Sequence, residues 1–434
     1  MIKQVELERV ELAAPENNFI LGSQGENIMN KINKKILLYI FIIIILISAI
    51  VYLLFSKPDY ILKIFQSNKS NTYLYDRNNS EIAVIPYGDT TFFDNIKSYY
   101  LASALEEILD DIKEKENISE EDAEKKLATS ESKIYTCMDF NIQKKLEEIY
   151  ANNDNFENDK ESSSIVLDNI SGETLAIVGG RNKENKIITF GMDKSNFNLN
   201  RATESLRQPG PMLSLISVYA YGLNNGTFTL NSKYLDTPIE NSKFQPKNYY
   251  VDYKGELTIK EAIEYGSNII KIKALQSTNI DDCFEFVKKL NIPLTDEDKN
   301  IASLALGGLT KGCTLLEISA AYRTILTDGT YKKSCFYSKI LDKNNNIYLA
   351  NQQDNRKIVT LETCNDIKSC IKSSTNNETL YLKFGTPNDS KDQWSIVNST
   401  NYTISTWQGY DLPKTMEFTE KEAEILSLKI LNSI

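Results

Sequence analysis

The sequence contains no histidine. Its absence excludes Ser-His-Asp and Cys-His nucleophilic catalysis, together with every metal site that needs histidine. Serine with lysine as its base remains the main nucleophilic chemistry open to this chain. The six cysteines show no C-x-x-C spacing of a metal cluster, so we expect no metal and no cofactor. Their spacing leaves the disulfide state open.

Basic residues are too few for a nucleic-acid partner. The 434 residues include 49 Lys and Arg against 59 Asp and Glu, a formal net charge of −10. No basic stripe with interleaved aromatic residues occurs, which excludes binding to nucleic acid. The length and the 41% of hydrophobic residues are sufficient for two or three domains with a core.

Charge is absent from one long stretch near the N-terminus. Residues 36–55 read ILLYIFIIIILISAIVYLLF, about the length needed to cross a bilayer. A cleaved signal peptide has a shorter apolar run and a small-residue cleavage site, so the pattern favours an uncleaved anchor over a signal peptide or a buried core helix. Lys31, Lys34 and Lys35 precede the run, and only Lys57 follows it closely. This bias places the N-terminal tail in the cytoplasm and the large C-terminal part outside.

One segment in the middle of the chain has the surroundings of a catalytic centre without its reactive groups. Residues 207–214 read RQPGPMLS. A helix that begins at about Pro211 tolerates proline there, because an N–H of the first turn has no partner within the helix. Proline offers no nucleophile, however, and Ser214, one turn later, offers no amine as a base. The alternative is that Pro-Gly-Pro is only a joint between a loop and a helix.

This segment resembles the first motif of the penicillin-binding transpeptidases, which cross-link peptidoglycan. In that family R-Q-P-G leads into S-x-x-K, where the Ser attacks a peptide carbonyl and the Lys handles its proton. Here Pro211 stands at the position of the Ser and Ser214 at that of the Lys. We expect no neighbouring amine to compensate. The resemblance implies a family member that has lost its first catalytic motif.

A second block, residues 255–268 (GELTIKEAIEYGSN), resembles the family pattern G-x-V-T-L-x-x-A-L-x-x-S-x-N. Gly266 then lacks the hydroxyl that relays a proton in active relatives. Asn268, whose counterpart helps to hold the substrate backbone, remains. Ser267 is a poor substitute, because a shift of one residue along a helix turns a side chain by roughly 100°.

A third block, residues 383–394 (KFGTPNDSKDQW), resembles K-T-G-T-x-N-x-x-x-D-x-W. In the family this strand lines the cleft: the Lys supplies positive charge, the hydroxyl binds the substrate carboxylate, and the Gly allows close backbone approach. Lys383, Gly385 and Thr386 are kept, and Phe384 replaces the hydroxyl. The ring of Phe384 either points into the cleft and narrows it or points into the core.

Other blocks follow in the family's order, so that the resemblance covers about residues 72–86 and 99–411. It is the order of class A penicillin-binding proteins without their glycosyltransferase domain, and it implies an α+β fold with an antiparallel sheet, flanking helices and a helical subdomain. Apolar spacing in 101–126 predicts two helices around a turn at 117–119, and 164–178 predicts a hairpin. The further blocks are 75–83 (YDRNNSEIA), 134–143 (IYTCMDFNIQ), 246–249 (PKNY), 305–308 (ALGG) and 316–322 (LEISAAY).

These observations predict a membrane-anchored, catalytically inactive pseudoenzyme of the cell membrane. We expect it to act in cell-wall assembly by binding peptidoglycan or another cell-wall synthesis protein. The predicted segments are a cytoplasmic tail (1–34), a transmembrane anchor (35–55), an extracytoplasmic linker or pedestal (56–160) and a transpeptidase-like domain (161–434). Positions of lost catalytic groups are Pro211, Ser214, Gly266 and Phe384, and the expected binding residues are Asn268, Lys383, Gly385 and Thr386.

Two alternatives stay open. The first is an active D,D-transpeptidase or carboxypeptidase with a non-standard nucleophile, Ser214 or Ser267, and the second is a structural wall-binding module without a protein partner. Two other S-x-x-K matches, 130–133 and 369–372, lie in polar stretches without supporting context. The bias towards Ile, Asn and Lys, together with the resemblance, indicates an AT-rich genome and a Gram-positive bacterium.

Overall fold

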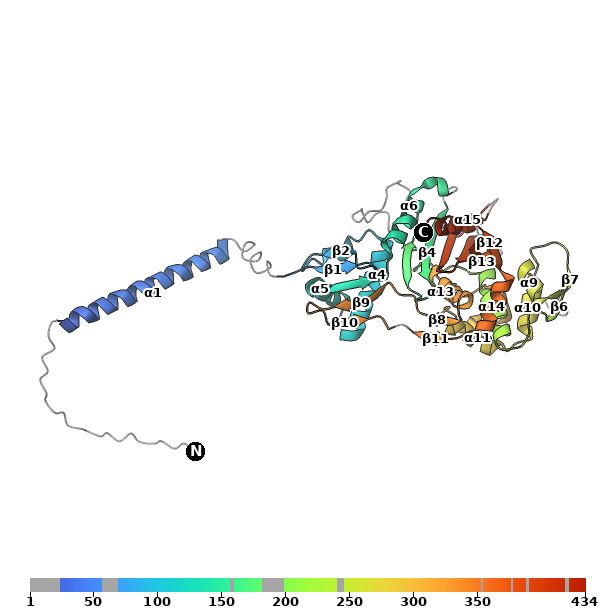
Figure 1. Cartoon of the computed structure of the whole chain (residues 1–434), viewed down its shortest axis with the longest axis horizontal. Coiled ribbons are helices and arrows are strands. Elements are labelled where there is room, and N and C mark those ends of the chain that lie inside the picture. The colour runs from blue at the N-terminus through green and yellow to red at the C-terminus, as the bar shows by residue number, and fades with distance from the viewer. Residues whose placement is uncertain are drawn as a thin grey trace, which may run out of the picture. The chain divides into compact units, whose positions relative to one another are not determined.

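A computed structural model gives the fold of the chain, which divides into two compact units, Met1–Lys69 and Ser70–Ile434 (Figure 1). Each unit is described by itself. The structure describes residues 24–56, 69–156, 160–181, 199–239, 246–352, 354–375, 378–387, 390–417 and 421–434.

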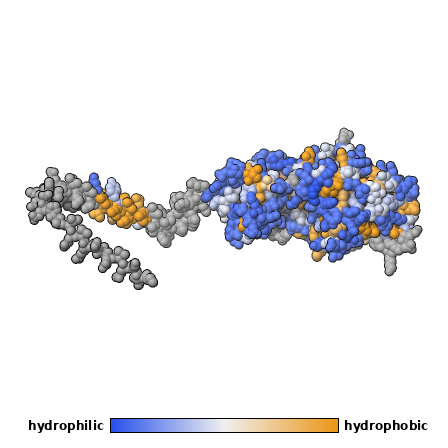
Figure 2. All heavy atoms as spheres, turned by 90° about the horizontal axis from the view of Figure 1, so that it is seen from below, coloured by the Kyte–Doolittle hydropathy of each residue, from blue (hydrophilic) through white to orange (hydrophobic). Residues whose placement is uncertain are grey.

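The first unit contains one long helix, α1 (Gln24–Ser56). Its described side chains, 34–49 and 52, are exposed, and Figure 2 shows a hydrophobic surface along them. Among the described residues, no helix combines the length and the hydropathy that crossing a membrane requires. The predicted tail (1–34) and the predicted anchor (35–55) lie partly outside the side chains that the structure describes.

The second unit is built around a six-stranded sheet with the order β12-β13-β14-β15-β4-β5. All five neighbouring pairs are antiparallel. The predicted hairpin is formed by β4 and β5. This arrangement confirms the antiparallel sheet that the resemblance implies. The strands are β4 (Glu161–Asp168), β5 (Thr174–Val178), β12 (Lys372–Thr375), β13 (Glu378–Gly385), β14 (Asp392–Asn398) and β15 (Tyr402–Gly409).

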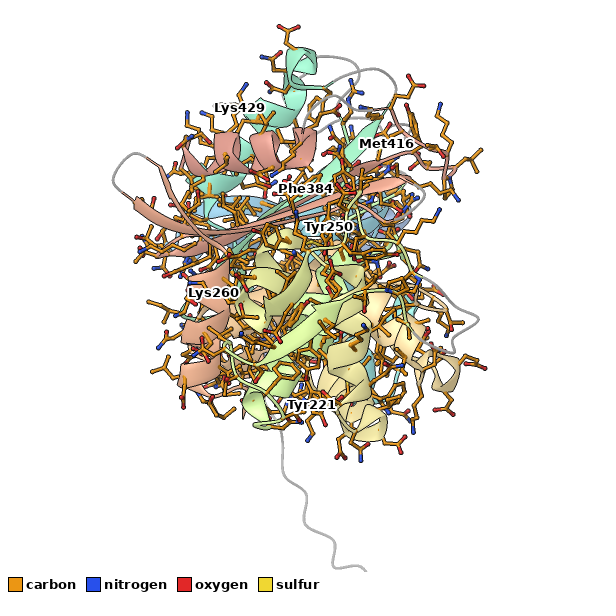
Figure 3. The ribbon with its side chains drawn as sticks, turned by 90° about the vertical axis from the view of Figure 1, so that its right-hand side faces the viewer. Tyr221, Tyr250, Lys260, Phe384, Met416 and Lys429 are labelled. Carbon is orange, nitrogen blue, oxygen red and sulfur yellow. The ribbon has the colours of Figure 1, made fainter. Side chains whose placement is uncertain are left out.

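Helices cover both faces of this sheet. Thr406 and Trp407 are neighbours on β15, so their side chains point to opposite faces. The Ser427 hydroxyl of α15 (Glu422–Leu431) donates to Thr406 Oγ1 at 2.8 Å on one face, and on the other face the guanidinium of Arg207, a loop residue, lies 4.7 Å from the centre of the Trp407 ring. Figure 3 shows the helix that carries Lys429 on one side of the sheet and those that carry Lys260 and Tyr221 on the other.

A second sheet, with the order β10-β9-β3-β1-β2, joins strands from distant parts of the chain. β3, from the predicted pedestal, pairs with β9, from the predicted C-terminal domain. The two helices predicted before β3 are confirmed, and Ser98 and Ser119 cap their N-termini. The elements are β1 (Thr72–Tyr75), β2 (Glu81–Ile85), β3 (Lys133–Thr136), β9 (Tyr337–Leu341), β10 (Ile347–Ala350), α3 (Thr91–Asp94), α4 (Tyr99–Glu116), α5 (Glu120–Thr129) and α6 (Phe140–Ala151).

Short helices and two small sheets form the remainder of the unit. Capping boxes at Thr258 and Thr314 begin α9 and α13, because each threonine and a glutamate three residues later satisfy free N–H groups of the first turn. The elements are α7 (Pro211–Ser214), a π-helical segment (Leu215–Ala220), α8 (Tyr221–Asn224), β6 (Lys233–Asp236), β7 (Gly255–Thr258), α9 (Ile259–Tyr265), α10 (Asn268–Gln276), α11 (Ile280–Lys289), α12 (Ile301–Leu306), α13 (Leu315–Leu326), β8 (Thr330–Lys332), β11 (Asn355–Lys357) and α14 (Leu361–Cys370).

Candidate functional site

The first motif, residues 207–214, lies directly beside β13, the strand that carries the start of the third motif, residues 383–394. α7 begins at Pro211, as predicted, with the proline in the first turn. Gly385 of β13 makes room for Met212, since a Cβ on Gly385 would lie 2.8 Å from Met212 Cγ. Gly210 likewise approaches Pro387, whose Cα would lie 3.1 Å from an added Cβ. Residue 211 therefore stands where the first and third motifs meet.

The side chain of Phe384 points away from the contact between α7 and β13. Side chains alternate along β13, so Lys383 and Gly385 share one face and Phe384 lies on the other. The contact with Met212 shows that the Gly385 face is the α7 face. Lys421 Nζ, at the start of α15, lies 5.5 Å from the centre of the Phe384 ring. The Phe384 ring is therefore not placed against α7.

The second motif is a joint between two helices. Gly266 ends α9 with φ of 70°, a conformation that glycine adopts without strain. Ser267 begins α10: its Oγ accepts from Ile270 N at 3.1 Å and donates to Asp236 Oδ1 at 2.9 Å. Asp236 is fully buried and also accepts from the Tyr250 hydroxyl at 2.7 Å. The Ser267 hydroxyl is therefore held by a cap and by a buried carboxylate.

Both polar atoms of the Asn268 side-chain amide are hydrogen-bonded within the protein. Nδ2 donates to Lys247 O at 2.8 Å, and Oδ1 accepts from Lys271 Nζ at 3.1 Å. Lys271 is only 3% exposed, and among the described residues its amine forms no ion pair and bonds to no hydroxyl. An amine is thus buried at the second motif without a counterion in the described part of the chain.

Lysine side chains with lowered pKa values gather at this point. Burial, and after it the charge of Lys383, lowers the pKa of Lys271 to about 7. Burial and the charge of Lys421 lower the pKa of Lys383 to about 8. Since the charge of Lys383 acts on Lys271, and Met212 packs against Gly385, parts of the three motifs form one electropositive region. We call it the motif junction and define it as residues 210–214, 266–271 and 383–387.

Lys271 is an amine that the sequence analysis did not single out. The amine comes from α10, one turn after Asn268, and not from the first motif. Lys271 and Lys273 both interrupt the apolar residues Ile269, Ile270 and Ile272 of this helix, and of the two lysines only Lys271 is buried. A lysine in such a run is either exposed or buried for a reason, and spacing alone does not distinguish the two.

Ser214, the other candidate nucleophile, is committed to its own helix turn. It is 1% exposed, and its Oγ donates to Pro211 O at 2.8 Å. The two remaining S-x-x-K matches do not form a helical pair. Ser130 follows α5 and Lys133 lies in β3, while Ser369 lies in α14 and residue 372 begins β12.

Thr386 completes the third motif at the end of β13. Its Oγ1 is buried and has no hydrogen-bond partner among the described residues. Two cavities of the structure, of about 470 Å³ and about 250 Å³, are lined by residues outside the motif junction. In the described ranges, no cluster of Cys, Asp and Glu could hold a metal ion.

The sheet, the flanking helices and the motif junction define the class of module, and comparison with known proteins agrees. The family model "Penicillin binding protein transpeptidase domain" matches residues 163–414. The chain belongs to this family. The blocks 246–249, 255–268, 305–308, 316–322 and 383–394 lie within the matched residues and are thereby assigned to a penicillin-binding transpeptidase module.

Relatives in sequence are larger proteins. Penicillin-binding protein 1A of Clostridium botulinum is 24% identical over 348 residues, which are 74% of this chain and 41% of the relative. Penicillin-binding protein 1F of Bacillus subtilis is 27% identical over 266 residues, 58% of this chain and 35% of the relative. The chain therefore spans less than half the length of these relatives.

Solved structures share the fold at low sequence identity. Penicillin-binding protein 1A from Haemophilus influenzae superimposes with a TM-score of 0.60 at 14% identity, covering 84% of this chain and 92% of that structure. The D,D-transpeptidase domain of a peptidoglycan glycosyltransferase from Eggerthella lenta gives 0.59 at 14% identity, with coverage of 84% and 98%. These likenesses confirm the predicted transpeptidase-like α+β fold.

Proposed function

We propose that this chain is a catalytically inactive member of the penicillin-binding transpeptidase family that acts in peptidoglycan assembly by binding. The observation that carries the proposal is Pro211 at the start of α7, next in sequence to Met212, which packs against Gly385 of β13. The resemblance of residues 207–214 assigns the nucleophile to position 211. Proline has no group that can attack a carbonyl. Ser214 and Ser267, the serines nearest in sequence to the lost groups, use their hydroxyls within the fold.

The Lys271 amine supports this proposal and does not oppose it. Acyl transfer by a serine needs a hydroxyl in contact with its base. Lys271 bonds to an amide oxygen and to no hydroxyl among the described residues. A base of suitable pKa is present, and in the described part of the chain it contacts no hydroxyl that it could activate.

The retained residues favour binding of an anionic group at the motif junction. Lys383 and Lys271 are amines that repel each other, and Thr386 Oγ1 has no partner in the described part of the chain. An anion between them relieves the repulsion and accepts charge-assisted hydrogen bonds. Asn268 and Gly385 shape the same place. A carboxylate of a cell-wall peptide or of a partner protein has the required chemistry.

We place the protein in the cell membrane, with residues 56–160 as an extracytoplasmic pedestal and 161–434 outside. The support is the uncharged run 36–55 and the excess of lysine before it. Crosslinking in native membranes followed by pull-down tests for a cell-wall enzyme as partner. Sedimentation with purified sacculi tests for peptidoglycan itself, and a negative result in both contradicts a binding role.

Labelling with a fluorescent penicillin tests inactivity. The full chain in detergent should acquire no covalent label, while an active transpeptidase of the family, labelled in parallel, should acquire one. Mass spectrometry of the peptides then checks each serine. An adduct on Ser214 or Ser267 would replace this proposal with an active enzyme that uses a non-standard nucleophile.

A further inference from the structure

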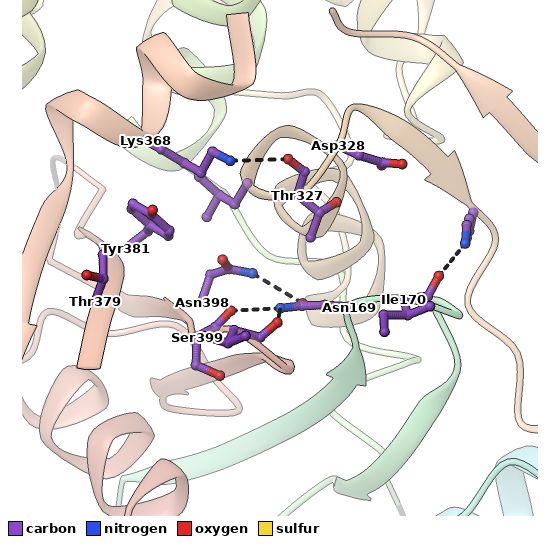
Figure 4. Close-up of a pocket in the computed structure, with 12 residues that line it drawn as sticks. Asn169, Ile170, Thr327, Asp328, Lys368, Thr379, Tyr381, Asn398 and Ser399 are labelled. Atoms are coloured by element: carbon purple, nitrogen blue, oxygen red, sulfur yellow. Dashed lines mark hydrogen bonds between the residues drawn. The ribbon is translucent and has the colours of Figure 1, made fainter. Parts of the chain in front are cut away.

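A cavity of about 470 Å³ lies at the end of the six-stranded sheet that is remote from the motif junction (Figure 4). Along the β13–β14 pair, Gly385 is opposite Trp394 near the junction, and Tyr381 is opposite Asn398 near the cavity. The cavity is within the size range of small-molecule sites. Its walls come from the β4–β5 turn, the end of α13, β8, α14, β13 and the β14–β15 turn.

Asn169 makes the floor of this cavity rigid. Its Oδ1 accepts from Asn398 Nδ2 at 3.2 Å and from the Thr403 hydroxyl at 2.7 Å, and its Nδ2 donates to Ser399 O at 2.8 Å. Its carbonyl accepts from the fully buried Arg323 at 2.9 Å. Since every polar atom of the Asn169 side chain is bonded within the protein, the floor is already ordered before a ligand binds.

The walls present hydroxyl groups that the protein does not use. Thr379, Tyr381 and Thr400 line the cavity, and among the described residues no hydrogen bond joins their side-chain hydroxyls to the protein; Thr379 and Thr400 are exposed, so a ligand can reach them. Each can both donate and accept. Tyr381 adds an aromatic ring that is half-buried. Hydroxyl groups around an aromatic ring suit a ligand that has hydroxyl groups of its own and a ring with an apolar face.

Positive charge predominates at the cavity. Lys368 and Lys332 line it against a single acidic residue, Asp328, whose carboxylate accepts from the Thr330 backbone N–H and hydroxyl. Lys368 Nζ has one long hydrogen bond, 3.4 Å to Thr327 O, and lies 5.8 Å from the centre of the Tyr381 ring. Behind the floor, Arg323 has a buried Nε without a partner in the described part of the chain. An acidic group is therefore favoured over a basic one.

We propose that this cavity binds a hexose-sized, hydroxyl-rich ligand with one acidic group. Tyr381 packs on the ring of the ligand, Thr379 and Thr400 exchange hydrogen bonds with its hydroxyls, and Lys368 pairs with its acid. The proposal stands on the cavity and does not depend on whether the motif junction is catalytically active.

Ligand-observed NMR on the full chain in detergent tests it. N-Acetylmuramic acid is the acidic probe, and N-acetylglucosamine, which lacks only the lactyl acid, is its neutral counterpart. The acidic sugar should bind more tightly. Lys368→Met should weaken the acidic sugar about fivefold and leave the neutral one unchanged, because the variant removes one exposed charge pair. Tyr381→Ala should weaken both.

Lys343→Met, at an exposed position in the β9–β10 turn, is the matched control and should change neither affinity. Thermal unfolding of each variant verifies that it is folded. The proposal would be overturned if neither sugar bound or if both bound with equal affinity. It would also be overturned if Lys368→Met and Tyr381→Ala left the affinities unchanged. Labelling with penicillin tests the motif junction and not this cavity. Failure of the sugar-binding proposal can therefore be distinguished from failure of the proposed function.

Discussion

Lys271 Nζ donates a hydrogen bond to Asn268 Oδ1 at 3.1 Å, and this bond joins a residue of the second motif to an amine that no motif supplies. Asn268 is the residue that the resemblance assigns to substrate binding. In this chain its amide is held from both sides, by Lys271 and by the Lys247 carbonyl. The motif junction therefore contains a buried amine that bonds to the Asn268 side chain.

Lys271→Met should stabilise the protein at neutral pH. The native pKa of Lys271 is about 7, whereas an unfolded lysine titrates near 10.4. Between these values the unfolded state binds more protons, so the stability of the native protein falls as the pH falls from about 10 to about 7. Without the amine this loss of stability does not occur, so the free energy of unfolding at pH 7 should increase by on the order of 3 kcal/mol. Denaturation with urea at pH 7 and pH 10 measures it, and an equal gain at both pH values would contradict the explanation.

Gly385→Ala should destabilise the fold by about 1–3 kcal/mol through overpacking. The added Cβ would lie 2.7 Å from Met212 Sδ, closer than real contacts allow. Gly308→Ala is the control, because a Cβ there meets no atom within 4 Å and the site is exposed. Unfolding free energies of Gly385→Ala, Met212→Ala and the double variant form a cycle. Strict additivity would show that residues 212 and 385 do not pack against each other.

Asp236→Asn should lower the free energy of unfolding at pH 7, and this decrease should become smaller as the pH falls. Burial acts to raise the pKa of Asp236, but hydrogen bonds from Tyr250, Lys254 N, Asn248 and Ser267 outweigh it and lower the pKa. The carboxylate therefore contributes stability above the unfolded pKa of about 3.9, and this contribution is lost as the pH falls through the native value. The expected loss at pH 7 is about 2 kcal/mol. Thermal unfolding from pH 7 to pH 3 checks it, and a loss that is the same throughout would be inconsistent with a charged Asp236.

Cys137 and Cys335 should be the pair that an oxidant joins first. Their Sγ atoms are 3.6 Å apart and both side chains are buried, so a small rotation brings them to the length of a disulfide bond. Oxidised glutathione, which takes up the two electrons, should remove two titratable thiols per chain. Cys137→Ser and Cys335→Ser should each prevent the loss, while Cys283→Ser should not. A different cross-linked pair in the peptide map would refute the assignment.

Much of the fold could be predicted, because the signals for it are local. The two helices in 101–126, the hairpin in 164–178 and the helix start at Pro211 follow from apolar spacing, turn residues and capping. The second sheet could not be predicted in this way. β3 pairs with β9 some 200 residues later, and a pairing of that kind depends on how both strands bury their faces.

By itself the sequence determined the family and the order of the elements, and it predicts which chemical groups the three motifs lack, since these are properties of residue types at given spacings. Only the tertiary structure decided which side chains meet. It brought Lys271 to Asn268, turned Phe384 towards α15, and built a cavity from segments on either side of the sheet's far end. The physical reason is that burial, repulsion between charges and unused hydrogen-bonding groups arise from the packing of segments that are distant in sequence.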